Sequence, residues 1–137
     1  MVRNRFKKVL LVAPNVFPDQ LVTDYKTVKH IESVSAIFPA LFELRPDLVI
    51  FDYDYVGEDI EKVLRRITNN KFYDSLKICC YKSTSNEKTD SFLKMLGVDY
   101  FVFKEDLVKA EKSKTVLSNF GNILDTSVLK WMGSVSN

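Results

Sequence analysis

Short apolar runs alternate with amphipathic stretches along the chain. Four runs are apolar throughout, which is typical of strands covered on both faces of a parallel sheet. A fifth strand is predicted at residues 28–34, where His30, Glu32 and Ser33 dilute the apolar pattern. The four apolar runs are residues 9–12, 48–51, 78–81 and 100–103.

The segments between these runs carry apolar residues at helical spacing. The clearest helix is predicted at residues 60–67, with acidic residues before it and arginines near its end, as the helix dipole favours. Ser35 is a candidate N-cap for another helix, and Thr84 with Glu87 resembles a capping box whose helix stops at Gly97. Ser35 precedes the helix predicted at residues 37–44, and two further helices are predicted at residues 19–26 and 116–124.

Five strands alternating with five helices predict an α/β fold: a doubly wound five-stranded parallel sheet with helices on both faces. Functional groups in such sheets gather at the carboxyl ends of the strands. Acidic, basic and hydroxyl side chains follow several of the predicted strands, and we expect them to converge there. The candidate pocket residues are Asn15, Asp52, Asp54, Lys82, Ser83 and Lys104.

Composition agrees with one soluble domain. The chain has 137 residues, 46% of them hydrophobic, and a net charge of +2. That surplus is too small to indicate a nucleic-acid partner, and no uncharged stretch is long enough for a membrane helix. Cys79 and Cys80 are adjacent in an apolar run, which predicts reduced, buried thiols and a cytoplasmic location.

Two segments resemble the receiver domain of bacterial response regulators, the CheY-like family. Residues 46–52 are similar to its third strand and phospho-accepting aspartate, and residues 97–104 are similar to its fifth strand and terminal lysine. The resemblance implies a flavodoxin-like strand order 2-1-3-4-5 and makes Asp52 the phosphoacceptor equivalent. It also puts Phe101 at the position of an aromatic switch. Residues 1–124 form the receiver-like domain, and residues 125–137 are expected to add a helical extension or tail.

The chain departs from the family pattern at the metal site. Ala13 and Pro14 stand where the family carries an acidic pair that binds Mg²⁺, and only Asn15 is nearby. Lys82 takes the place of a serine or threonine, and Glu105 replaces a proline after Lys104. We therefore expect no cofactor, with Mg²⁺ binding weak or absent, and no metal-ligating residues.

The charges suggest what replaces the metal. If Lys82 and Lys104 flank Asp52, their cations would favour the ionised carboxylate and fix the pocket in one charge state. In the alternative arrangement, Lys82 points to solvent and Asp52 forms a partly buried ion pair with Lys104.

These features predict a signalling module of a phosphorelay, or two-component, system that works through protein partners rather than as an enzyme, with weak or absent phosphorylation of Asp52. A histidine kinase or an output protein would be the partner. A homodimer through the fourth helix, fifth strand and fifth helix is a further expectation. One alternative is a conventional receiver phosphorylated at Asp52, and another is a receiver cut from a longer protein. A remote alternative is a haloacid-dehalogenase-like phosphatase, whose nucleophile motif residues 52–56 resemble.

Overall fold

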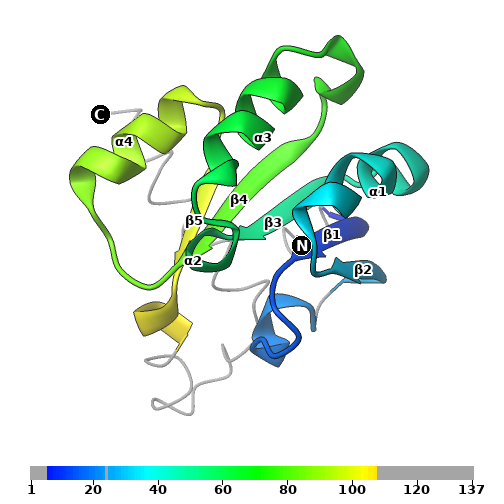
Figure 1. Ribbon diagram of the computed structural model, residues 1–137. Coiled ribbons are helices and arrows are strands. Elements are labelled where there is room, and N and C mark those ends of the chain that lie inside the picture. Colours follow the sequence, from blue (N-terminus) through cyan, green and yellow to red (C-terminus); the bar gives the residue numbers. More distant parts are fainter. Residues whose placement is uncertain (1–5, 24, 108–137) are drawn as a thin grey trace.

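The computed structural model describes residues 6–23 and 25–107. Its centre is a five-stranded sheet, all parallel, in the order β2-β1-β3-β4-β5 (Figure 1). The predicted fold class and strand order are confirmed. The strands are β1 (Lys8–Val12), β2 (Thr27–Ile31), β3 (Leu48–Asp52), β4 (Lys77–Lys82) and β5 (Tyr100–Phe103).

Helices and turns connect the strands. The α-helices are α1 (Ile37–Leu44), α2 (Tyr53–Val56), α3 (Asp59–Thr68) and α4 (Glu87–Met95). Three 3₁₀ turns are present among the described residues: η2 (Asp19–Leu21), η3 (Val34–Ala36) and η4 (Lys71–Tyr73). Within the described ranges, no helix is both long and apolar enough to span a lipid bilayer.

Alternation along the strands divides the core into two layers. Leu10 and Val12 of β1 face a layer built with the buried sides of α1, α3 and α4, whereas Val9 and Leu11 face the opposite layer. In the described part of the chain, Leu21 of η2 and Leu107 pack in that opposite layer. Both faces of the sheet are thus closed over apolar side chains.

The two adjacent cysteines are divided between the layers. Cys79 belongs to the layer with Leu21, and Cys80 to the layer with the three longer helices. Both are free thiols with no exposed surface. The prediction of buried, unbridged cysteines is confirmed.

The helix predicted at residues 19–26 is wrong. Between β1 and β2 the described chain forms only the short turn η2, which begins after Pro18 and buries one of its residues, Leu21. Of the described residues in this segment, Leu21 and Tyr25 are buried. Two such residues do not supply the repeated apolar face that stabilises an amphipathic helix.

Two predicted helix caps are also wrong. Ser35 lies within η3, and α1 begins after Ala36 without a side-chain cap. Asn86, not Thr84, caps α4 by accepting a hydrogen bond from the Thr89 N–H at 3.0 Å. The predicted stop at Gly97 agrees with the structure, because α4 ends at its C-cap Leu96 and Gly97 follows with φ of 109°.

The end of the chain lies outside the described residues. Residues 104–107 are helical, and the description stops there. The predicted helix at 116–124, the boundary at residue 124 and the extension at 125–137 all lie beyond it.

Candidate functional site

The candidate site lies at the carboxyl ends of β1, β3, β4 and β5. Asp52 is the last residue of β3, and α2 follows it directly (Figure 1). In the sheet register, Asp52 stands opposite Tyr81, and Lys82 stands opposite Phe103, the residue before Lys104. Parallel pairing therefore brings together strand ends that lie far apart in the sequence.

Asp52 is buried and caps the helix that follows it. Asp52 is 4% exposed, and its Oδ1 accepts a hydrogen bond from the Tyr55 N–H at 3.1 Å. Burial raises the pKa of the Asp52 carboxyl, and attraction to Lys104 and the bond from Tyr55 offset only part of this effect. This shift is opposite in direction to the one expected from flanking cations, because desolvation outweighs the attraction of Lys104.

Asp54 forms the ion pair of the pocket, and its partner is Lys104. Lys104 Nζ lies 3.1 Å from Asp54 Oδ2, which also accepts hydrogen bonds from the backbone N–H and the hydroxyl of Ser83. Burial alone would raise the pKa of Asp54, but the bonds from Ser83 and Lys104 prevail and hold it below its usual value. Among the described residues, the ion pair expected between Lys104 and Asp52 is therefore made with Asp54 instead.

Lys82 turns away from Asp52. As the last residue of β4 it follows the strand alternation to the helix side of the sheet, where its Nζ lies 2.6 Å from Asp90 Oδ1 of α4. The lysine residue is 4% exposed, so both expected positions, beside Asp52 and in solvent, are wrong. Its ammonium also lies 4.9 Å from the centre of the Tyr53 ring.

Asp90 is the site residue that sequence reasoning missed. Its second oxygen accepts hydrogen bonds from Asn86 N at 3.1 Å and from Ser85 Oγ at 3.3 Å. Lys82 and Asp90 thus form a buried ion pair to which Ser85 and Asn86 of the following loop are hydrogen-bonded, an arrangement we call the β4–α4 tie. The signal available in the sequence was an acid one helical turn after the N-cap Asn86, in the helix that follows a strand ending in lysine.

The end of β1 is closed by a histidine. His30 of β2 donates from Nε2 to the Ala13 carbonyl oxygen at 2.8 Å, and its ring lies 4.8 Å from that of Phe17. Ala13 is fully buried, and Asn15 is exposed. His30 thus serves as a strand residue whose ring bonds the backbone at the end of β1.

These groups do not fit Mg²⁺, which requires near-octahedral oxygen ligands supplied largely by carboxylates and phosphate. Ala13 and Pro14 bring no carboxylate, and the carboxylates of Asp52 and Asp54 already accept protein hydrogen bonds. In the part of the chain that the structure describes, no three His, Cys, Asp or Glu side chains are placed to hold a metal. Weak or absent Mg²⁺ binding stays a prediction.

Phe101 is packed inside the fold. It is 5% exposed, and its ring lies nearly parallel to that of Phe103, with centroids 6.1 Å apart. On α4, Phe92 and Met95 are exposed. The fifth helix of the expected dimer face lies outside the described residues.

The two carboxylates of the site should respond to pH in opposite directions. The native Asp52 holds its proton more tightly than in the unfolded chain, so its contribution to stability falls as pH rises from about 3.8 through its higher native pKa. Asp54 contributes stability above about pH 3.8 that is lost as pH falls through its lower native pKa. Urea midpoints across this range should therefore move in opposite senses for Asp52→Asn and Asp54→Asn relative to wild type. Equal and parallel pH profiles for the two variants would contradict this assignment.

The fold of this chain has counterparts among solved structures. The sequence matches no protein-family model and no curated protein. Among solved structures, the chain is similar to the signal receiver domain of a DNA-binding response regulator (merR) from Colwellia psychrerythraea 34H, with TM-score 0.59 and 18% identity over 78% of this chain and 96% of that one.

Two further structures give the same result. A LuxR-family two-component response regulator from Aurantimonas sp. SI85-9A1 aligns with TM-score 0.61 and 13% identity, over 93% of this chain and 98% of that one. The isolated REC domain of RcsB from Salmonella enterica serovar Typhimurium aligns with TM-score 0.57 and 16% identity, over 80% and 90% of the two chains. The chain therefore has the fold of a response-regulator receiver domain.

Proposed function

We propose that this chain is a receiver-like signalling module of a two-component phosphorelay that acts by binding protein partners, with weak or absent phosphorylation of Asp52. The observation that carries the proposal is that Asp54 already pairs with Lys104 and accepts a hydrogen bond from Ser83. The end of β1, at Ala13 and Pro14, supplies no carboxylate beside it. Phosphoryl transfer to an aspartate needs a cation that neutralises the charge developing on the phosphoryl oxygens. The end of β1 has no acidic pair to bind such a cation.

The β4–α4 tie supports a constant binding state. In a protein switched by phosphorylation, a group near the acceptor must be able to move toward the phosphoryl oxygens. Lys82 stands at the strand end from which such a group would come, but it is fastened to Asp90 at 2.6 Å in a buried site. Breaking this contact would leave two buried charges without partners, which is strongly unfavourable. The loop that it closes is thereby held in one arrangement.

The proposed module is not an enzyme, has a cytoplasmic location, and uses a histidine kinase or an output protein as its partner. Two solved neighbours are described as a DNA-binding and a LuxR-family regulator. Those descriptions belong to whole regulators, and the +2 charge of this chain gives no support for direct contact with nucleic acid.

The test is intact-mass measurement after treatment with acetyl phosphate, with and without Mg²⁺. We expect little or no gain of one phosphoryl group, because the catalytic cation has no carboxylate pair to bind. A receiver with an intact acidic pair, treated in parallel, is the positive control. A Mg²⁺-dependent adduct that disappears in Asp52→Ala would establish the conventional receiver instead. Hydrolysis of a chromogenic phosphate ester that Asp52→Ala abolishes would establish the phosphatase.

A further inference from the structure

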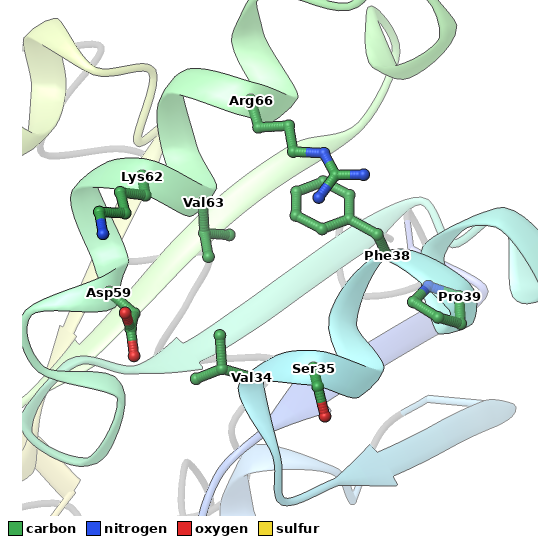
Figure 2. Close-up of a pocket in the computed structure, with 8 residues that line it drawn as sticks. All are labelled: Val34, Ser35, Phe38, Pro39, Asp59, Lys62, Val63 and Arg66. Atoms are coloured by element: carbon green, nitrogen blue, oxygen red, sulfur yellow. The ribbon is translucent and has the colours of Figure 1, made fainter.

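A groove of about 340 Å³ separates α3 from η3 and the start of α1 and includes none of the candidate pocket residues (Figure 2). Its walls combine an apolar centre with cationic side chains. We propose that this groove binds an acidic helical segment of a partner protein, which places an apolar side chain between the walls and carboxylates on Arg66 and Lys62. The groove is lined by Val34, Ser35, Phe38, Pro39, Asp59, Lys62, Val63 and Arg66.

Arg66 is the strongest reason for an anionic ligand. Figure 2 shows its guanidinium lying over the Phe38 ring, and the Cζ atom is 3.8 Å from the ring centre. Stacking holds the guanidinium plane in place while leaving the N–H groups at its edge free to donate. In the described part of the chain these groups donate to no protein carboxylate. A fixed, unpaired guanidinium is suited to bidentate binding of a carboxylate.

Lys62 supplies a second cation one helical turn away. It precedes Arg66 by four residues, so both side chains lie on the same face of α3. Lys62 also forms no ion pair with a described residue. Two carboxylates one turn apart on a partner helix would match this spacing.

Asp59 gives the groove a direction and limits the ligand class. Asp59, Lys62 and Arg66 follow one another along α3, and Asp59 lies where the helix begins. Its carboxylate would repel a continuous polyanion bound along these three side chains, and it would attract a basic residue at one end of a partner segment. A peptide with separate acidic and basic positions satisfies all three charges, whereas a phosphodiester chain does not.

Aromatic side chains next to the groove favour a protein partner over a small ligand. Starting at Phe38, ring contacts continue through Tyr73 and Phe72 to Phe42, with centroid separations of 6.1, 5.0 and 5.7 Å. Phe42 and Phe72 are exposed, and Arg45 lies over the Phe72 ring. Aromatic and arginine residues are enriched where proteins bind each other. These aromatic side chains extend the groove into a larger surface, which a partner helix would cover.

This inference rests on the interaction part of the proposed function and is independent of whether Asp52 is phosphorylated. The probe is a fluorescein-labelled helical peptide of about 15 residues, long enough to form a helix when capped. It carries glutamates four residues apart, leucines on the same face and a lysine at the end that meets Asp59. Fluorescence anisotropy with the full chain should show saturable binding that weakens as salt concentration rises.

Variants of the chain locate the binding. Arg66→Ala should lower the affinity for the peptide by about tenfold or more, because it removes charge-assisted hydrogen bonds. Arg66→Lys should restore only part of the affinity, because it keeps the charge but loses the planar fork. Arg65→Ala is the matched control: it lies beside Arg66 on α3 but pairs with Glu61 at 3.0 Å and does not line the groove. It should leave binding unchanged.

Several outcomes would overturn the proposal. They are an absence of binding, equal binding by a peptide with lysines in place of the glutamates, and equal losses in Arg65→Ala and Arg66→Ala. Tighter binding of a single-stranded RNA would reassign the groove to nucleic acid. A dimer of the chain that Arg66→Ala dissociates, without peptide binding, would reassign it to a second copy. None of these results bears on the acetyl phosphate test, so the two proposals fail separately.

Discussion

The Lys82→Met variant is expected to lose about 3–5 kcal/mol of unfolding free energy, since removing one partner of a buried ion pair leaves the other charge uncompensated. Lys82 and Asp90 are both buried, and their charged atoms are 2.6 Å apart. Methionine fills much of the volume of the lysine stem, so the loss would measure the stranded carboxylate rather than a cavity. Urea unfolding at neutral pH gives the value.

Two further variants identify the cause. Adding Asp90→Leu to Lys82→Met should recover more than half of the loss, because no charge is then left buried without a partner. Lys104→Met breaks a pair with Asp54 in which both side chains are well exposed, and it should cost under about 1 kcal/mol. A Lys82→Met protein as stable as wild type would place Lys82 in solvent and remove the β4–α4 tie from the account.

The Gly97→Ala variant is the second change with a large expected effect, a loss of about 2–5 kcal/mol from backbone strain together with overpacking. Gly97 has φ of 109°, a conformation that L residues rarely adopt. A Cβ atom at this position would clash with the Thr68 Cγ2 atom of α3. Since Gly97 joins α4 to the segment that enters β5, the variant should also perturb the strand that leads to Lys104.

Gly57→Ala is the matched control for this prediction. Gly57 also has positive φ, 63°, but nothing lies within 4 Å of the Cβ that would be added. Its cost should be about 1 kcal/mol, the backbone contribution alone. Thermal or urea unfolding of both variants separates the two effects. Equal losses would show that contact with Thr68 contributes nothing.

The sheet could be predicted from the sequence because its strands are apolar on both faces. Four strands were located to within one or two residues, since buried parallel strands leave little room for polar side chains. The edge strand β2 has a mixed burial pattern, and its predicted range ran past its end at Ile31 into η3. The 19–26 segment was misinterpreted because Leu21 and Tyr25 are buried at helical spacing, although the described chain there forms only η2 after Pro18.

The site could be predicted only as far as strand ends determine it. Asp54, Ser83 and Lys104 do meet, because the carboxyl ends of parallel strands lie along one edge of the sheet. Asp52 is close to them, but its charge preference depends on burial, which the sequence does not display. The partner of Lys82 depended on the side of the sheet to which the last residue of β4 points, and Asp90 lies on a helix that sequence alone cannot place against that strand.

The division of Cys79 and Cys80 between the two layers gives this fold a pair of internal reporters. Burial raises the pKa of Cys80 to about 12 and raises that of Cys79 well above its usual value, so neither thiol reacts while its layer stays closed. Each becomes reactive only when its own side of the sheet opens. Pulse alkylation followed by peptide mapping would therefore distinguish loosening of the helical side from loosening of the side that holds Leu21, without any engineered label.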